Sequence, residues 1–374
     1  MPEHLIDEEI GVLERPRQFA ESERLPGLHL VAANRLIRGP EAREDFDVDG
    51  SGLSAAVLDT GLRVSHVDFA GRVSSQVNFT DDNGGDAGDA SDGHGHGTNV
   101  GGIVVADGLH EGVAPGGSIV PLKVMKNTGA GSFRAVHDAL EWIVEQHEEH
   151  AITVVCMSLS GRVNHQSDQG FADEIVRDRI RQLREKRIAV VVAAGNDFFT
   201  HGSRQGMAFP AILRECVSVG AVYDSHGGPF SYGSGARAAV AAPDRVTPFS
   251  QRLHESVGLE CRTDIFAPGA PIKSAGIEND RAESEQQGTS QATPVVAGVL
   301  MLLQQLHRRE TGELPEVEDL VRLMRNTAVT VHDGENQGAD NVVNTGLDFP
   351  RVDAFAALLA LEEEIRSAAA SADP

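Results

Sequence analysis

The sequence predicts a three-layer α/β fold, in which helices cover both faces of a mainly parallel central sheet. Four short runs are almost wholly apolar, as strands buried in a parallel sheet are: LSAAVLDTG (53–61), SIVPLKVM (118–125), ITVVCMSLSG (152–161) and IAVVVAAGN (188–196). Amphipathic segments separate these runs. Polar groups lie at three of their ends, where open parallel sheets bind ligands: Asp59, the turn 158–161 and Asn196.

Helices are expected between and after these strands. SFRAVHDALEWIVEQHEEH (132–150) has apolar residues at helical spacing and Ser132 in the N-cap position. FADEIVRDRIRQLREKR (171–187) has the same pattern, and TNVGGIVVADG (98–108) suits a short helix capped by Thr98. The segment after Gly288 predicts a helix that continues to Leu303, with Pro294 in its first turn.

The charge and composition exclude some classes of partner. The chain has 374 residues and a formal charge of -24, which opposes binding to nucleic acid because a duplex-binding surface needs clustered lysine and arginine. The acidic, lysine-poor surface is either an adaptation to high salt or an aid to solubility. We see neither a signal peptide nor an 18-residue apolar run, so we expect a cytoplasmic protein without a membrane partner. The oligomeric state stays open.

Three cysteines, Cys156, Cys216 and Cys261, lie far apart in the sequence. Two of them stand within apolar runs that read as strands. Their odd number and wide spacing favour buried thiols in a reducing compartment over disulfides or metal ligands.

Two histidines stand two residues apart in SDGHGHGTNVGG (91–102). A metal ion held by His94 and His96 would still need carboxylate or thiol ligands from elsewhere in the chain. His96 directly precedes the helix and can point into a cleft. His94 is expected to be a solvated loop residue.

Three residues together supply the groups of a nucleophilic mechanism. Ser290 lies at a helix N-terminus, where the backbone N–H groups favour a developing negative charge. A serine hydroxyl becomes a good nucleophile when an imidazole takes its proton and a carboxylate orients that imidazole. His96 and Asp59 can fill these roles, and the amide of Asn196 can bind an oxyanion. Taken singly, Asp59 also fits a turn former and Ser290 an N-cap.

Seven blocks of sequence resemble the subtilisin-like serine peptidases, or subtilases, and occur in the order of that family. They are AAVLDTG (55–61), GHGTNVGG (95–102), GVAPGGSIVPLKV (112–124), MSLSG (157–161), VVAAGN (191–196), FAPG (266–269) and GTSQATPVVAGV (288–299). The resemblance spans about residues 28–362 and implies a subtilisin-like fold with the chain order aspartate, histidine, serine. It implies that Asp59, His96 and Ser290 are the catalytic triad and that Asn196 is the oxyanion donor.

The resemblance also implies how a polypeptide substrate binds. An extended peptide would add as a strand between two edges, which comprise Gly129, Ala130, Gly131, Ser158, Leu159, Ser160 and Gly161. The sequence departs from the family at Asn99, where a second histidine is usual, and at Ser160, where glycine is usual. Asn99 is expected to have little effect on catalysis, and Ser160 leaves the preferred substrate side chain open.

We expect no metal or other cofactor to be required. Asp68 matches a carboxylate that often binds calcium in this family, but the following loop ADGLHEGVAP (106–115) is too short to supply the usual carbonyl ligands. The acidic loop DDNGGDAGDASD (81–92) is either a cation site or a solvated flexible loop.

The chain is predicted to have an extension (1–26), a subtilisin-like peptidase domain (27–362) with a surface insertion (227–243), and a polar tail (363–374) after a helix at 352–361. The short extension resembles that of intracellular family members, in which such a segment can cover the cleft. It is either a restraint on activity or a disordered tail.

The predicted function is that of a serine endopeptidase, which hydrolyses peptide bonds in proteins through an acyl-enzyme. Two alternatives remain at this stage. One is a subtilase-like transpeptidase or macrocyclase, which transfers the acyl group to an amine. The other is an inactive peptidase that serves as a binding module, although all four catalytic positions are intact.

Overall fold

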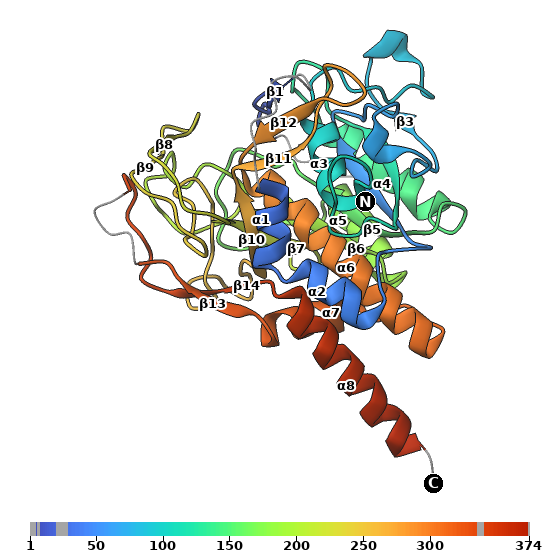
Figure 1. Ribbon diagram of the computed structural model, residues 1–374. Helices are drawn as coiled ribbons and strands as arrows, with labels where there is room; N and C mark the ends of the chain where they lie inside the picture. Colours follow the sequence, from blue (N-terminus) through green and yellow to red (C-terminus); the bar gives the residue numbers. More distant parts are fainter. Residues whose placement is uncertain (1–4, 6–7, 20–28, 335–339, 373–374) are drawn as a thin grey trace.

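The computed structural model describes residues 5, 8–19, 29–334 and 340–372, and a nine-stranded sheet forms their centre (Figure 1). The strand order is β13 (Val329–His332), β14 (Asp348–Arg351), β10 (Ile265–Ala270), β7 (Val217–Tyr223), β6 (Ala189–Ala193), β5 (Ile152–Met157), β2 (Ser54–Asp59), β4 (Ser118–Lys123) and β3 (Val77–Asn78). Neighbouring strands run parallel except β13 and β14. The predicted fold class and all four predicted strands are confirmed.

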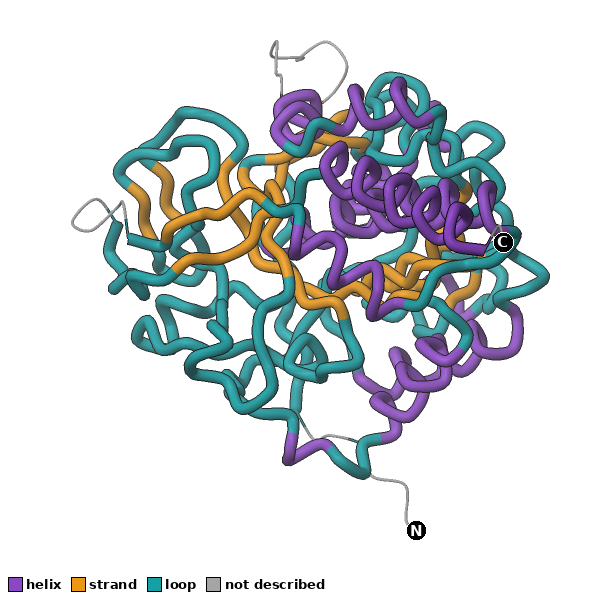
Figure 2. The backbone as a smooth tube through the Cα atoms, turned by 90° about the horizontal axis from the view of Figure 1, so that it is seen from below, coloured by secondary structure: helices purple, strands orange, loops and turns teal. Residues whose placement is uncertain are grey.

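Helices pack on both faces of this sheet (Figure 2). One face carries α1 (His29–Leu36), α2 (Gly39–Phe46), α3 (His96–Val105), α6 (Thr289–Thr311), α7 (Val317–Asn326) and α8 (Ala354–Ala372). The other face carries α4 (Phe133–Gln146) and α5 (Ile175–Glu185). Side chains of β2 alternate between the two apolar cores, with Ala55 and Val57 in one and Ala56 and Leu58 in the other, which is why each strand is apolar throughout.

Two smaller β structures lie outside the central sheet. Residues of the extension form β1 (Arg17–Phe19), which pairs with β12 (Glu283–Gln286), and β12 pairs in turn with β11 (Ile272–Ala275). Within the insertion 227–243, β8 (Phe230–Ser231) and β9 (Arg237–Ala238) form a hairpin. The predicted boundary between extension and domain at 26–27 lies outside the described residues.

Helix α8 is longer than predicted. The sequence predicts a helix at 352–361 followed by a polar tail, whereas the helix continues to Ala372 and projects from the body (Figure 1). The residues after Leu361 are mostly alanine, glutamate and arginine, which are strong helix formers. Glu362 and Arg366 also form an ion pair at 2.8 Å with helical spacing. The last two residues of the predicted tail, 373–374, lie outside the described residues.

The described residues contain no helix with both the length and the apolar character needed to cross a membrane. The three cysteines are free and buried, as predicted.

A buried ion pair anchors the loop that follows β6. Arg252 is fully buried, its Nε atom donates to Asp333 Oδ2 at 2.9 Å, and its guanidinium lies over the Phe198 ring at 3.5 Å. Removing the carboxylate would leave an uncompensated buried charge. We therefore expect Asp333→Ala to lower the free energy of unfolding by about 3–5 kcal/mol, measured by denaturant titration. Glu362→Ala, which breaks the exposed pair on α8, is the control and should cost less than about 1 kcal/mol.

Candidate active site

Asp59 and His96 form a buried pair at the carboxyl end of the sheet. Asp59 is the last residue of β2 and His96 the first residue of α3, and both side chains are at most 1% exposed. His96 Nδ1 lies 2.7 Å from Asp59 Oδ1 and 2.9 Å from Oδ2. The N–H of Thr60 donates to Asp59 Oδ1 at 2.7 Å. This geometry orients the imidazole and leaves its Nε2 atom for a reacting group.

Asp92 builds the start of α3, and the prediction that Thr98 caps this helix is wrong. Asp92 Oδ1 accepts from the N–H groups of His94 (2.9 Å) and Gly95 (2.8 Å), and Oδ2 accepts from that of Thr98 (2.9 Å). Asp92 therefore holds the turn before the helix and satisfies the free N–H of Thr98 in its first turn, and the helix begins two residues earlier than predicted. Gly95 has φ +102, a left-handed conformation that favours glycine.

Thr60 and Lys123 connect these groups, and the sequence reasoning did not identify either residue. The Thr60 hydroxyl donates to Asp92 Oδ1 at 2.9 Å and accepts from the N–H of Gly97 at 2.9 Å. Buried Lys123 Nζ donates to the Thr60 carbonyl at 2.6 Å. The sequence feature that could have identified Lys123 is its position near the end of the apolar run 118–125, because a lysine buried there needs polar partners.

Ser290 is the second residue of α6, and its backbone is tied to the predicted substrate edge. Pro294 lies beyond the predicted first turn, and because it has no N–H, the carbonyl of Ser290 lacks its usual helical donor. The Ser158 hydroxyl donates to that carbonyl at 2.7 Å. In return, the Ser290 hydroxyl donates to the Ser158 carbonyl at 3.1 Å.

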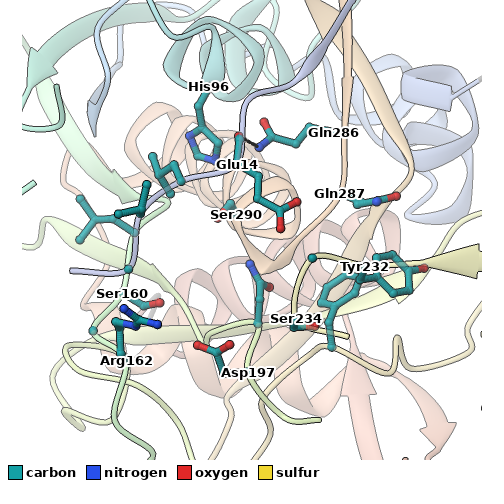
Figure 3. A pocket seen from close by; sticks show the side chains of 18 residues that line it. Glu14, His96, Ser160, Arg162, Asp197, Tyr232, Ser234, Gln286, Gln287 and Ser290 are labelled. Carbon is teal, nitrogen blue, oxygen red and sulfur yellow. Dashed lines mark hydrogen bonds between the residues drawn. The ribbon is translucent and has the colours of Figure 1, made fainter. Parts of the chain in front are cut away.

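Asn196 follows β6 and its amide has a defined orientation. Its Oδ1 atom accepts from the N–H of Thr289 at 2.9 Å and from the Thr289 hydroxyl at 3.0 Å. Since the oxygen takes both donors, the N–H₂ group is left for the cleft that Asn196, His96 and Ser290 line together (Figure 3). We call this space the catalytic cleft.

The four predicted catalytic residues therefore come together, but one predicted contact is absent. Within the part of the chain that the structure describes, His96 Nε2 is buried and has no hydrogen-bond partner. The Ser290 hydroxyl donates to the backbone carbonyl of Ser158 instead of to His96. Rotation about the Cα–Cβ bond of serine can redirect the hydroxyl, and catalytic hydrogen bonds are often formed only when substrate is present.

The extension lies in the catalytic cleft between the two predicted substrate edges. The N–H of Gly11 donates to the Ser160 carbonyl at 2.9 Å, and the N–H of Leu13 donates to the Gly129 carbonyl at 3.0 Å. Ile10 forms an antiparallel bridge with Gly161. The remaining predicted edge residues, Ala130, Gly131, Ser158 and Leu159, continue these two segments. An extended chain thus occupies the place predicted for a substrate.

Beyond these contacts, the extension passes directly over the reacting groups. Glu14 lies between His96, Gln286 and Ser290 (Figure 3), and its carbonyl accepts from Gln286 Nε2 at 2.7 Å. The next residues form β1 on β12. This segment therefore lies in the same cleft as Ser290.

His94 is buried, so the prediction of a solvated loop histidine is wrong. Its side chain is covered because the extension lies on it, with Nε2 3.2 Å from the Leu13 carbonyl. Burial and the neighbouring His96 lower the pKa of His94. The two histidine rings lie 6.4 Å apart and do not face a common metal position, because His96 Nδ1 binds Asp59.

The two departures from the family pattern have different surroundings. Asn99 is buried and connects three elements, since its Nδ2 donates to Ser284 Oγ at 2.9 Å and its Oδ1 accepts from Gln291 Nε2 at 3.3 Å. Ser160 lines the catalytic cleft. The predicted surface insertion 227–243 also contributes to the cleft, through Tyr232, Gly233 and Ser234.

Asp68 does not fit a calcium ligand in this chain, because its carboxylate is already fully bonded. Oδ1 accepts from the N–H groups of Leu109 (2.5 Å) and His110 (3.2 Å), and His110 Nδ1 lies 2.6 Å from Oδ2. Burial alone would lower the pKa of His110, but the hydrogen bond to Asp68 and the Glu283 carboxylate, 3.4 Å from Nε2, outweigh it and raise the pKa to about 9. A protonated imidazole therefore supplies the positive charge at this carboxylate.

The acidic loop 81–92 is bonded to the body rather than solvated throughout. Asp81 pairs with Lys126 at 2.6 Å, and Asp82 Oδ2 lies 3.4 Å from Lys123 Nζ. Asp92 binds the start of α3 as described above. Asp86 and Asp89 accept from backbone N–H groups two residues ahead, both at 2.9 Å. These partners explain the shape of the loop without a cation.

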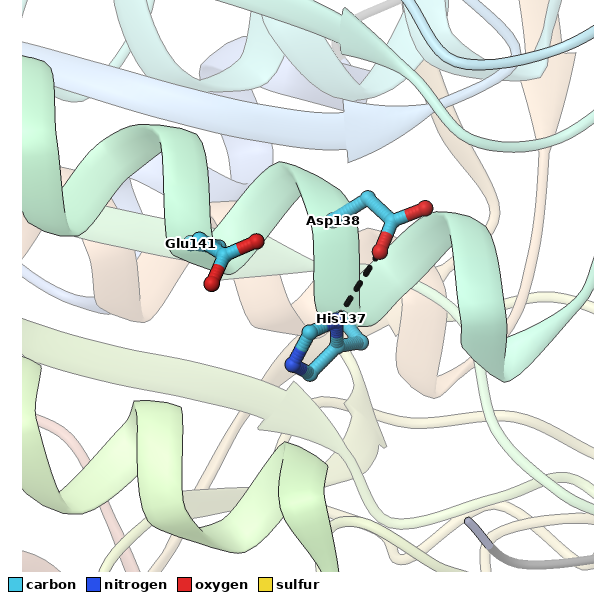
Figure 4. Close-up of side chains that lie close together, drawn as sticks. All are labelled: His137, Asp138 and Glu141. Atoms are coloured by element: carbon cyan, nitrogen blue, oxygen red, sulfur yellow. Dashed lines mark hydrogen bonds and ion pairs between the residues drawn. The ribbon is translucent and has the colours of Figure 1, made fainter. Parts of the chain in front are cut away.

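One group of three potential metal ligands occurs among the described residues, on α4 and away from the cleft: His137, Asp138 and Glu141 (Figure 4). Asp138 Oδ1 lies 2.9 Å from His137 Nδ1, and Glu141 pairs with Arg179 at 2.8 Å. These contacts account for the group as local ion pairing.

Comparison with known proteins places this geometry in context. A family model described as the subtilase family matches residues 50–348. The major intracellular serine protease of Bacillus subtilis is 30% identical over 298 residues, which cover 78% of this chain and 81% of the relative. An intracellular serine protease of Paenibacillus polymyxa is 29% identical over 283 residues, with 74% of each chain covered. The serine protease AprX of Bacillus subtilis is 29% identical over 303 residues, 75% of this chain and 62% of the relative.

Proposed function

Because the chain belongs to the subtilase family and is a serine endopeptidase, we propose that Asp59, His96 and Ser290 form its catalytic triad. The observation that supports this assignment best is the buried pair between Asp59 and His96, whose free Nε2 atom faces the same cleft as Ser290. Asn196 is proposed as the oxyanion donor, because its oxygen is held by Thr289 and its N–H₂ group is left for the cleft.

In the proposed mechanism, His96 Nε2 takes the hydroxyl proton as Ser290 attacks the peptide carbonyl. Asp59 keeps the proton of Nδ1 in place and stabilises the imidazolium that forms. The developing oxyanion lies against the Asn196 amide and the backbone N–H of Ser290, at the positive end of α6. His96 then protonates the leaving amine, and water hydrolyses the acyl-enzyme. The substrates are polypeptides, and hydrolysis is favoured over transpeptidation because the relatives are named proteases.

The assignment is tested with a fluorophosphonate probe and with casein. Wild-type protein should label and degrade casein, and Ser290→Ala should do neither, because the probe reacts with an activated serine. Ser371→Ala, an exposed serine on α8, is the matched control and should behave as wild type. A wild-type protein that stays unlabelled even after the extension is displaced would overturn the assignment.

The extension is proposed to restrain the enzyme. Gly11 and Leu13 bond to both substrate edges, and Glu14 lies at the triad, so the extension and a substrate compete for the same donors and acceptors. The extension and the cleft that it occupies belong to the same chain. Binding of the extension is therefore intramolecular and does not depend on protein concentration.

We also propose a cytoplasmic enzyme that needs no metal ion and does not bind nucleic acid. Two of the three named relatives are described as intracellular proteases, the cysteines are free and buried, and the formal charge is -24. The absence of a metal requirement is supported by the saturated carboxylate of Asp68.

Chelation and pH together test the role of Asp68. We expect EDTA to leave the melting temperature unchanged. His110 contributes stability that is complete below about pH 6.5 and is lost as the pH rises through about 9, since its folded pKa exceeds the unfolded value. The contribution is up to about 3 kcal/mol, so His110→Gln should flatten the alkaline loss of unfolding free energy between these pH values. A melting temperature that falls in EDTA would contradict the proposal.

A further inference from the structure

A partly buried contact between a carboxylate and an imidazole joins the beginning of the extension to the body of the enzyme. Glu8 Oε1 lies 2.6 Å from His165 Nε2, and the two side chains are 13% and 21% exposed. The mechanism does not use either residue. Most surface ion pairs contribute little, but a partly buried and hydrogen-bonded one gains strength because water screens it less.

The body of the enzyme holds His165 in place without help from the extension. The ring packs edge-on against Phe171, with centroids 4.9 Å apart. The backbone of His165 exchanges two hydrogen bonds with Met207, at 2.8 and 2.9 Å. These contacts come from the body of the enzyme, so the position of the His165 ring does not depend on Glu8 alone.

Gly161 makes room for the carboxylate beside His165. A β-carbon added to Gly161 would lie 2.2 Å from Glu8 Oε2, closer than such atoms approach one another. The substrate edge therefore has a gap in its side chains at the position where Glu8 enters.

The register of the extension fixes which residue reaches His165. Ile10 is 4% exposed and lies in the apolar core with Phe133 and Leu159. Residues two apart in an extended chain point to the same side, so Glu8 and Ile10 face the enzyme together. The hydrogen bond from Gly11 to Ser160 holds this register.

We propose that His165 and Gly161 form a carboxylate-binding subsite for peptide substrates. The released enzyme then prefers segments in which a glutamate precedes an aliphatic residue by two positions. This inference rests on the proposed peptidase function, and it adds a substrate class to it. Backbone pairing with the two edges accepts many sequences, whereas the His165 contact selects one kind of side chain.

The test compares peptide pairs that differ only in glutamate or glutamine, cleaved by the full-length protein. The glutamate is moved one residue at a time along the segment before the cleaved bond, with an isoleucine always two positions after it. The readout is the ratio of kcat/KM for the two members of a pair. Occupation of the cleft by the extension lowers both values equally, so the ratio reports the subsite alone. We expect glutamate to be favoured about tenfold at one position and not at the others.

Two variants assign the preference to His165. His165→Gln should bring the ratio close to one. His332→Gln removes a matched histidine, which pairs with Asp348 at 2.7 Å on β13, and should keep the wild-type ratio. Efficient cleavage of both peptides with a ratio near one throughout would overturn the subsite while leaving the peptidase intact. Failure to cleave any peptide even after the extension is displaced would instead remove the proposed function, and the subsite with it.

Discussion

His96→Ala is expected to lower kcat by about a millionfold, the size of effect known from another member of the same family. The base that accepts the Ser290 proton is then absent, and only the oxyanion donors and substrate binding remain. The measurement is hydrolysis of a fluorogenic peptide, with circular dichroism to show that the variant is folded.

His94→Ala is the matched control, since His94 is two residues away and equally buried. It binds the Leu13 carbonyl and has no contact with Asp59, so its loss should retain most of the activity or raise it by loosening the extension. Equal losses in the two variants would contradict the assignment of the base.

Ile10→Asp is expected to raise the basal activity of the full-length protein by about 30-fold or more. Ile10 is 4% exposed, and burying such a side chain stabilises the docked extension by about 2–3 kcal/mol. A carboxylate at this position would have to be buried without a partner, which adds to the cost of docking. The population of open enzyme rises accordingly, up to the limit at which every molecule is open. The measurement is the initial rate on a short fluorogenic peptide.

Val12→Asp is the control within the same segment. Val12 is 64% exposed, so a polar side chain there should change the free energy of docking of the extension only slightly. Its effect on the rate should be small. A wild-type rate in Ile10→Asp, with the variant protein folded, would show that the extension does not restrain the enzyme.

The strands, and the polar residues that meet at the catalytic cleft, could be predicted because they depend on local patterns. Each of the four apolar runs became a strand, and three of these strands end at or shortly before the predicted polar groups. Ser132 caps α4 as expected, with its hydroxyl accepting from the Ala135 N–H at 3.2 Å. These features follow from periodicity and from the chemistry of a few residues, which a single sequence contains.

The sequence reasoning missed two partners that come from distant parts of the chain and one that is near in sequence. The burial of His94 depends on Leu13, which lies 81 residues away in sequence. The cap of α3 comes from Asp92, a residue that reads as part of an acidic loop until its contacts are known. Likewise, the partner of Asp68 is His110, which looked like one more loop residue rather than a substitute for a cation. Composition and spacing do not report such tertiary contacts.

A proline inside a helix usually destabilises it, but Pro294 in α6 also makes a contact to another segment possible. Because Pro294 has no N–H, the carbonyl of Ser290 accepts from the Ser158 hydroxyl instead, and this bond joins α6, which carries the proposed nucleophile, to the edge proposed to bind the peptide. The same segment, around Ser158, would therefore position both the Ser290 hydroxyl and the bound peptide. A small shift of α6 would move the Ser290 hydroxyl and the peptide together. The distance between the attacking oxygen and the target carbonyl would then change little during thermal motion of the protein.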